Sequence, residues 1–208
     1  MRLQFGELNI TPRVVNRLHE LDFTVPELED AIAEHKSSCD GEPSVYVGTY
    51  GKYNEGSLCG LWIDLSSFDD YDEFINFCKA IHADEPDPEL DAQDWECLPQ
   101  GLDGDDLFIE EKWDLLQEYL ELCDRFDADA VNAYICCYDI YSLSGFEERY
   151  QGEFKSEEDF AEYIVNELYD LDRLMGNLSY YFDYEKYARE LFMSDYSIEN
   201  GYVFNNLA

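Results

Sequence analysis

Basic residues are scarce in this chain. Its 208 residues include 13 lysines and arginines against 49 aspartates and glutamates, which gives a formal net charge of −36. Self-repulsion on this scale destabilises a compact state, so we expect the charge to serve a function. Phosphates would be repelled by such a surface, which excludes nucleic acid as a direct partner.

Long apolar runs are also missing. The first ten residues, MRLQFGELNI, lack the apolar core of a signal peptide. No run approaches the roughly 18 apolar residues of a membrane-spanning helix, so no membrane partner is expected. The seven cysteines form no CxxC motif, and the adjacent Cys136 and Cys137 cannot easily bridge each other. Free thiols in a reducing cytoplasm are the simplest interpretation.

Signatures of catalysis and of metal binding are absent as well. The histidines His19, His35 and His82 are far apart and have no neighbouring cysteine ligands, which argues against zinc. We interpret His82, at the end of an amphipathic pattern, as a favourable helix-end charge. Asp127–Asp129 begins like a calcium loop but lacks its glycine. No GxSxG, P-loop or dinucleotide fingerprint occurs. We therefore assign no catalytic, cofactor-binding or metal-binding residue.

The chain is nevertheless built to fold. Hydrophobic residues make up 46% and aromatic residues 16% of it, which is too much for a disordered acidic tail. The acids are spread evenly, with 9, 13 and 14 in the first three blocks of 50 residues and 13 in the last 58. The folded surface itself is therefore anionic. Such a surface suits basic proteins, cations, or a protein site that normally holds nucleic acid.

Residues 1–42 form a first segment, for which we expect a short helical N-terminal module. Thr11-Pro12 and Thr24 followed by Pro26 are both typical of helix starts. The composition of residues 37–43 predicts a linker. This segment carries a net charge of −5, against −31 for the rest of the chain.

Residues 43–100 predict a βα unit. The pattern of residues 44–65 indicates a β-hairpin whose two strands are joined by the loop GKYNEG. Asp69 or Asp70 can cap the next helix, whose apolar face would run from Tyr71 to Ile81. A further strand is expected around residues 94–98.

Residues 101–141 predict a helical unit, with one helix over residues 109–123 and a second capped by Asp127. Residues 142–208 predict an α/β unit. In it, GFEERYQGEF is typical of either a strand or a broken helical turn, and Ser156 should cap a helix with Phe160, Ile164 and Leu168 buried.

The C-terminal part of that unit is rich in tyrosine. Asp183 can cap a helix in which Tyr184, Tyr187, Ala188 and Leu191 share one face. Asn200-Gly201 predicts a tight turn that leads into a final strand at residues 202–205. The fold class is therefore α+β, as an elongated chain of small domains.

The charge suggests mimicry of DNA. Duplex DNA carries one charge per about 1.7 Å, so 36 charges match roughly 18 base pairs or about 60 Å. A compact sphere of this mass would be only about 40–45 Å across, so a chain of small domains fits the charge better. Acids four residues apart on a helix lie about 6 Å from each other and destabilise it, so their presence asks for a reason. A merely solvated acidic surface, as in halophilic proteins, is the alternative; scarce lysine favours it and the aromatic content argues against it.

The expected mimic surface consists of acids on the predicted helices and on the proline-bearing loop after residue 82. These are Asp69, Asp70, Asp72, Glu73, Asp84, Glu85, Asp87, Glu110, Glu111, Asp114, Glu118, Glu121, Glu157, Glu158 and Glu162.

Four stretches carry a family resemblance. They are VYVGTYGKYNEGSLCGLWIDL (45–65), HADEPDPELDAQDWE (82–96), YQGEFKSEEDFAEYIV (150–165) and YFDYEKYARELFMSDYSIENGYVF (181–204). In order and spacing they resemble the ArdA antirestriction family over about residues 44–204. Residues 1–42 lie outside the resemblance, which gives them no role; we favour an accessory module because their charge density is low.

The resemblance implies a curved rod of three small domains shaped like bent B-form DNA and encoded on mobile genetic elements. It implies a homodimer joined through the C-terminal domain, with no catalytic residues. The implied partner is a type I restriction–modification enzyme, with its methyltransferase core and specificity subunit, whose DNA-binding groove the protein would occupy. The family's antirestriction motif falls here on residues 174–191, beside the dimer contact. The corresponding dimer and motif residues are Tyr180, Tyr181, Asp183, Tyr184, Tyr187, Ala188 and Leu191.

The charge independently favours a joint at residues 180–191, because two copies can meet only where few charges oppose each other. Two other functions stay open: an acidic chaperone or binding module for basic proteins, and a carboxylate hydrolase, which is the less favoured because any carboxylate pair arises by chance among 49 acids.

Overall fold

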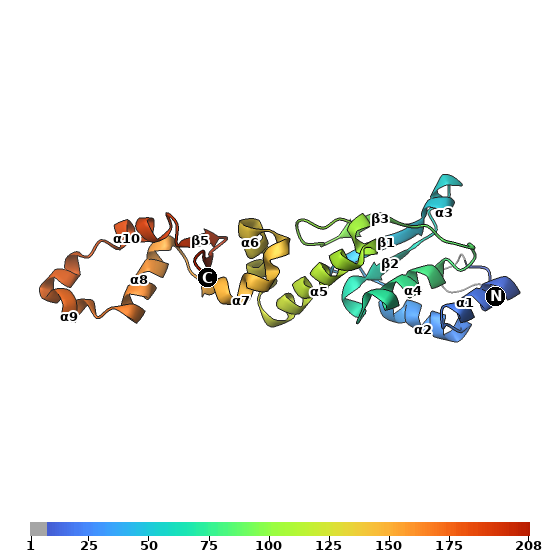
Figure 1. The fold of residues 1–208 in the computed structure, drawn as a ribbon, viewed down its shortest axis with the longest axis horizontal. Helices are drawn as coiled ribbons and strands as arrows, with labels where there is room; N and C mark the ends of the chain where they lie inside the picture. The colour runs from blue at the N-terminus through green and yellow to red at the C-terminus, as the bar shows by residue number, and fades with distance from the viewer. Residues whose placement is uncertain (1–7) are drawn as a thin grey trace. The chain divides into compact units, whose positions relative to one another are not determined.

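The computed structural model describes residues 8–208 (Figure 1). The chain forms two compact units, unit 1 up to Leu120 and unit 2 from Glu121 to Ala208. Both units combine helices with a small antiparallel sheet, so the α+β class is confirmed. The curved rod and the division at residues 42, 100 and 141 stay predictions, and residues 1–7 of the predicted N-terminal module lie outside the described part.

The sheet of unit 1 has three antiparallel strands in the order β2-β1-β3. They are β1 (Ser44–Thr49), β2 (Leu61–Asp64) and β3 (Leu90–Glu96). The predicted hairpin is confirmed, with Val45 opposite Ile63. The third strand exists but begins earlier than predicted. The predicted loop GKYNEG contains a short helix, α3 (Tyr50–Asn54), because the Thr49 side chain caps it by accepting a hydrogen bond from Lys52 N.

Unit 1 also contains the helices α1 (Pro12–Glu20), α2 (Val25–His35), η1 (Leu65–Ser67), α4 (Tyr71–Ile81), η2 (Asp105–Phe108) and α5 (Glu110–Arg125), which continues into unit 2. Three of them, α1, α2 and α4, begin at the predicted caps. Thr24 and Glu27 form a capping box at α2, in which each side chain accepts from the other residue's backbone N–H. At α4 the cap is Asp70, whose Oδ1 accepts from Glu73 N at 2.8 Å.

The core of unit 1 is aromatic. Phe74 stacks on Trp113 with ring centroids 4.5 Å apart, and Phe68 and Phe77 lie beside them. The N-terminal helices are part of this core, since buried His35 of α2 stacks on Phe68 at 4.1 Å. The predicted linker is not free either, because Ser37 N donates to Trp62 O and extends the sheet beyond β2.

Unit 2 is built around a second sheet with the strand order β4-β6-β5. Its elements are α6 (Ala128–Tyr138), η3 (Ile140–Gly145), α7 (Phe146–Arg149), β4 (Tyr150–Glu153), α8 (Glu157–Leu168), α9 (Leu171–Met175), η4 (Gly176–Tyr181), α10 (Tyr184–Leu191), β5 (Tyr196–Glu199) and β6 (Tyr202–Asn205). Residues 146–153 turn out to hold both a helical turn and a strand, the two readings that the sequence left open.

The predicted C-terminal hairpin of unit 2 is confirmed. Asn200 and Gly201 both adopt positive φ, 53° and 91°, as a type I′ turn requires, and the last strand spans the predicted residues. In the core, Tyr134, Phe146 and Phe204 pack edge to face.

One prediction about burial in unit 2 is wrong. Phe160 is buried, but Leu168 is 66% exposed because α8 ends there and the chain turns away into α9. Ala161 and Val165 are buried instead, on the face that packs against α10.

Candidate functional site

The acids at the start of α4 serve the helix as well as the surface. Glu73 Oε2 accepts from Asp69 N at 2.9 Å, while the side chain of the N-cap residue Asp70 accepts from Glu73 N. Asp72 lies in the same first turn, where the helix dipole stabilises negative charge. All four predicted acids here are exposed. They therefore present a cluster of negative charge in a geometry fixed by the backbone.

The acids that follow α4 are partly neutralised. Lys52 Nζ lies 2.9 Å from Asp84 Oδ1 and 3.6 Å from Glu85 Oε1. Glu85 also accepts from Thr49 Oγ1 at 2.6 Å and is half-buried. Asp87, the third predicted acid of this loop, is exposed and has no ion pair with Lys52. Asp84 and Glu85 therefore hold α3 against the loop, in addition to any contribution to the surface charge.

The prediction that His82 provides a favourable positive charge at the end of its helix is wrong. Its side chain is fully buried, and burial together with the nearby Lys52 lowers the pKa of His82 to about 4. The imidazole is therefore neutral at pH 7. Its Nδ1 accepts from Lys52 Nζ at 2.9 Å, so Nε2 carries the hydrogen and donates to Val47 O at 3.3 Å.

The five acids predicted between residues 110 and 121 all lie on α5. Four of the five are exposed, whereas Glu118 is half-buried. Glu110 and Asp114, and then Asp114 and Glu118, are spaced four residues apart. Trp113 and Leu116 are buried on another face of the helix. Side chains at this spacing lie about 6 Å apart, which gives a row of negative charges along the helix.

On α8, Glu157, Glu158 and Glu162 are all exposed. Ser156 caps this helix, with its Oγ accepting from Asp159 N at 3.1 Å. Glu158 and Glu162 form a further pair spaced four residues apart. The predicted pairs of acids are therefore located on helices in both units.

Further exposed acids lie in the turn GLDGDD, where the sequence predicts a domain boundary, and at the predicted cap Asp127. In the turn GLDGDD, Asp103 Oδ1 accepts from Asp105 N and Asp106 N at 3.1 and 3.2 Å, which fixes its carboxylate. Asp127 Oδ1 similarly accepts from Asp129 N at the start of α6. The high density of acids in these short stretches of sequence could have identified them as part of the acidic surface.

Basic side chains are few, and several of them are bound within their own unit. Six of those in residues 8–208 are held by carboxylates or backbone carbonyls of their own unit: Arg17, Lys52, Lys112, Arg125, Arg149 and Arg189. By sequence, unit 1 holds 29 acids and 7 bases, a net −22, and unit 2 holds 20 acids and 6 bases, a net −14. Each unit is therefore strongly anionic by itself.

The predicted tyrosine segment of unit 2 divides into two parts. Asp183 caps α10 as predicted, accepting from Lys186 N at 2.9 Å. Tyr184 and Tyr187 are half-buried around Phe182, with ring centroids 4.9 and 5.7 Å from it. Ala188 is buried on the same helix, and Leu191 is half-buried.

Tyr180 and Tyr181 lie outside this helix, on η4, and are 93% and 80% exposed. They belong to Leu174–Phe182, a run of nine residues without a charge, which we call the uncharged segment. Leu174 and Leu178 in it are also more than 60% exposed. Such a patch of exposed apolar side chains is typical of an interaction surface.

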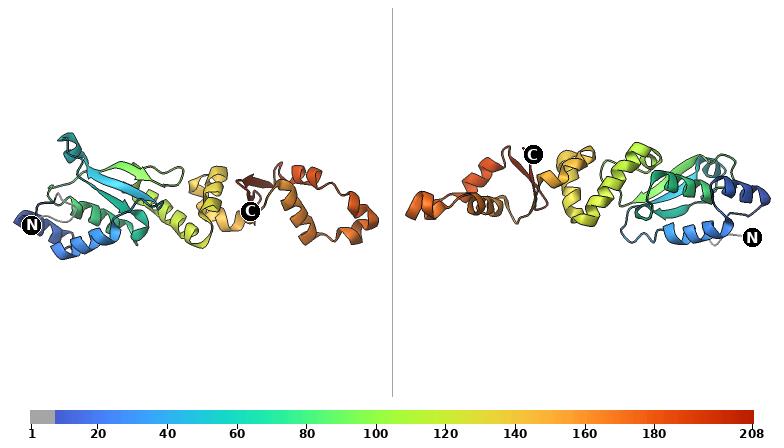
Figure 2. Two further views of the ribbon diagram at one scale, coloured as in Figure 1. Left: turned by 180° about the vertical axis from the view of Figure 1, so that it is seen from behind. Right: turned by 60° about the horizontal axis from the view of Figure 1, so that its bottom comes forward.

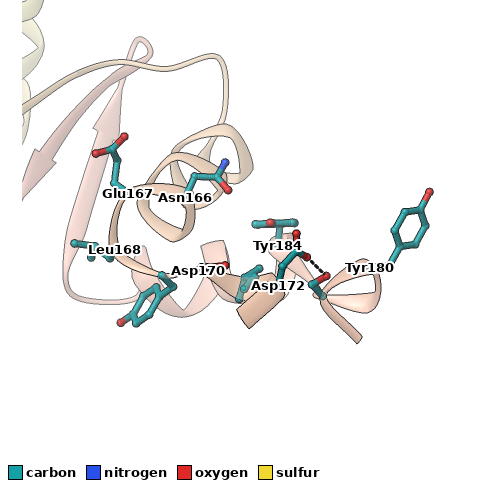
Figure 3. A pocket seen from close by; sticks show the side chains of 10 residues that line it. Asn166, Glu167, Leu168, Asp170, Asp172, Tyr180 and Tyr184 are labelled. Atoms are coloured by element: carbon teal, nitrogen blue, oxygen red, sulfur yellow. Dashed lines mark hydrogen bonds between the residues drawn. The ribbon is translucent and has the colours of Figure 1, made fainter. Parts of the chain in front are cut away.

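An open hollow of about 560 Å³ lies beside the uncharged segment. Its lining includes Glu167, Asp170 and Asp172 together with Tyr180 and Tyr184, and Figure 3 shows Tyr180 pointing away from the others. Asp172 Oδ1 accepts from Ser179 Oγ at 2.6 Å. No histidine or cysteine lines the hollow, whose polar side chains are carboxylates, tyrosines, Asn166 and Ser179.

Within residues 8–208, histidine, cysteine and carboxylate side chains form no group of three or more that could hold a metal ion. In the same residues, no helix has both the length and the apolar character needed to cross a membrane.

Comparison with known proteins gives one family. No curated protein matches the chain. The family model for the antirestriction protein ArdA matches residues 45–204, which include the sheet of unit 1, the acidic helices and nearly all of unit 2. The match leaves out α1 and α2, in agreement with the limits of the resemblance seen in the sequence. The chain therefore belongs to the ArdA family of antirestriction proteins.

Proposed function

We propose that this chain is a DNA mimic that occupies the DNA-binding groove of a type I restriction–modification enzyme and so prevents cleavage of incoming DNA. Family membership implies the antirestriction function. The observation that supports the mechanism is the arrangement of charge: pairs of exposed acids lie four residues apart on α5 and on α8, while several basic side chains are paired with carboxylates of their own unit.

The partner would be the methyltransferase core with its specificity subunit, because that part of the enzyme binds DNA. A groove that holds DNA is positively charged, so complementary fields would make association fast and sensitive to salt. The energy would be shared among many acids in both units. Single substitutions should therefore change inhibition little, and several together should weaken it strongly.

The proposal includes a homodimer joined through the uncharged segment and α10, and a row of small domains that follows the course of bent DNA. Two copies of a chain with charge −36 repel each other except where charge is low. The uncharged segment offers such a place, and its exposed Leu174, Leu178, Tyr180 and Tyr181 supply apolar area. Residues 8–42 would brace unit 1, because His35 and Ser37 pack against its core and sheet.

The test is cleavage of unmodified DNA by a purified type I enzyme. The wild-type chain should block cleavage at near-stoichiometric amounts, and excess unmodified target DNA should relieve the block. Methylation should be measured in parallel, because occupation of the groove would stop both reactions. Cleavage that continues in the presence of excess chain contradicts the proposal.

A second candidate, an acidic binding module for basic proteins, is favoured only by the even spread of charge. A histone-like basic protein serves as the control partner. If it binds as tightly as the restriction enzyme, and with the same dependence on salt, the second candidate replaces the first.

A further inference from the structure

Unit 1 carries an exposed aromatic tip that the acidic surface does not explain. α3 joins β1 to the loop before β2, and none of its residues is buried. Tyr50 and Tyr53 are 53% and 55% exposed, and Leu58 in the loop that follows is 68% exposed. Figures 1 and 2 show α3 projecting beyond the sheet of unit 1. We call Tyr50, Tyr53 and Leu58 the tyrosine tip.

The base of the tyrosine tip is firmly held by one backbone–backbone hydrogen bond and one from a tyrosine hydroxyl to the backbone. Tyr50 N donates to Glu89 O at 2.9 Å, and Tyr46 OH donates to Leu58 O at 2.8 Å. Gly60 approaches β1 so closely that a Cβ there would lie 2.4 Å from Val47 O. The two ends of the projection are therefore fixed against the sheet.

A charged cluster holds the middle of the projection. Lys52 turns inward and reaches His82 Nδ1 and Asp84 Oδ1, both at 2.9 Å. Its side chain is only 12% exposed. The exposed rings are therefore presented by a rigid support, which lowers the conformational entropy lost when a partner binds them.

The surroundings of the tip indicate the chemistry of its partner. Lys52 is the only basic residue between positions 50 and 60, and its charge is directed at Asp84 and Glu85. Exposed acids lie next to α3: Glu55 is its C-cap residue, and Glu89, whose carbonyl accepts from Tyr50 N, belongs with Asp87 to the segment before β3. A partner must therefore be basic at the rim and able to accept flat rings between its own side chains.

That combination describes a site that binds a nucleotide base beside the DNA backbone. Enzymes that modify a base turn it out of the duplex into a pocket where aromatic or apolar side chains stack on it. Stacking tolerates different rings because each ring has a π-face. A methyltransferase that modifies a base in duplex DNA needs such a pocket beside the site that holds the DNA backbone.

We propose that the tyrosine tip takes the place of an extruded base and stacks in the base pocket of the partner methyltransferase, while the surrounding acids take the place of phosphates. This inference rests on the proposed function and adds to it a discrete aromatic contact. It divides binding into a diffuse part that depends on salt and a local part that depends on two rings.

The probe is a duplex that carries 2-aminopurine at the base methylated by a type I methyltransferase core, whose fluorescence rises when that base is extruded. Wild-type chain should displace the duplex and quench this signal. The double variant Tyr50→Ala/Tyr53→Ala should need at least tenfold more protein for half displacement, because stacking on one ring contributes about tenfold or more in affinity. Leu207→Ala, which removes an apolar side chain that is 74% exposed in unit 2, is the matched control and should displace like wild type.

Two further variants separate ring stacking from general apolar contact. Tyr50→Phe/Tyr53→Phe should displace like wild type, whereas Tyr50→Leu/Tyr53→Leu should be as weak as the alanine pair. The slope of log affinity against log salt should be the same for all of these variants, because none of them changes a charge. Thermal unfolding should also be unchanged, since the substituted rings are exposed.

The outcomes are distinct. If wild-type chain displaces the duplex and the alanine pair does so equally well, the tyrosine tip has no such role, while the proposed function stands. If the leucine pair behaves like the phenylalanine pair, the contact is apolar packing and the base analogy is wrong. If wild-type chain displaces nothing, the proposed function and this inference are both overturned.

Discussion

The tyrosine tip of unit 1 and the uncharged segment of unit 2 expose the same kinds of side chain but are supported in opposite ways. The tip is fixed by a cluster of a buried histidine, a lysine and two carboxylates that holds the middle of the projection. The uncharged segment has short helices, no buried residue, and an open hollow beside it. Exposed aromatic residues therefore do not have a single meaning in this protein. A rigid projection surrounded by acids suits a basic partner, whereas a neutral segment suits a second copy of an anionic chain.

The largest effect should come from placing charge in the uncharged segment. Leu174→Asp/Leu178→Asp would bring at least four carboxylates together in a dimer joined there, and like charges placed opposite each other cost several kcal/mol. We expect association to weaken more than a hundredfold, so that light scattering at micromolar concentration reports half the wild-type mass.

The matched control puts the same two charges on the tyrosine tip. Tyr50→Asp/Tyr53→Asp should leave the mass unchanged. If both double variants become monomeric, the tip is also part of the dimer contact and the two regions do not differ in function. A wild-type chain that is already monomeric contradicts the dimer itself.

The second effect is the pH dependence of the support below the tip. The pKa of His82 is about 4 in the folded chain and 6.5 ordinarily. Below pH 6.5 the unfolded chain takes up a proton that the folded chain refuses until about pH 4, so stability is lost as pH falls through this window. With 1.36 kcal/mol per pKa unit, the loss amounts to about 3 kcal/mol.

His82→Gln isolates this contribution from the many carboxylates that titrate nearby. Urea unfolding at pH 7 and at pH 4 should show that the wild type loses about 3 kcal/mol more than the variant. If the wild type and the variant lose the same free energy of unfolding, His82 is not the buried neutral imidazole described above. Unit 2 contains no histidine, so its own transition should lack this contribution.

These two regions also show how far the sequence could be interpreted. Local chemistry predicted the helix starts at Thr24, Asp70 and Ser156, because a cap and its partner lie three residues apart. The same holds for the Asn200-Gly201 hairpin, whose turn type needs two residues that tolerate positive φ.

The features that were missed depend on distant contacts. α3 has only five residues between glycine-bearing stretches, and its stability depends on Lys52 meeting Asp84 and His82, 30 or more residues away. The exposure of Leu168 depends on where α8 ends and the chain turns away into α9. The exposure of the acids on the candidate surface was easier to predict, because charged side chains seldom leave water unless they are paired.

A third experiment removes the support while leaving the rings. Lys52→Met takes the cation from Asp84, Glu85 and His82, and leaving charged partners unpaired should destabilise unit 1 by about 2 kcal/mol. Hydrogen exchange at Tyr50, whose amide donates to Glu89 O, should become faster and approach that of the uncharged segment. Lys52→Arg keeps the charge and should exchange more slowly than Lys52→Met. Unchanged exchange in Lys52→Met would show that the backbone contacts alone hold the tip.

The smallest effect belongs to acids that lie in neither region. Glu158→Gln/Glu162→Gln removes a like-charge pair on α8 together with a first-turn charge that the helix dipole favours, so the two effects offset each other and thermal unfolding at low salt should change by less than about 0.5 kcal/mol. The same variant should weaken inhibition less than twofold while making it less sensitive to salt, because two of many shared charges are lost. The substitutions at the tyrosine tip should give the reverse, a large loss of affinity with an unchanged salt slope. If neutralising this pair weakens inhibition tenfold, these two acids form a discrete contact of their own, and binding is not divided between a diffuse charge and a local ring contact.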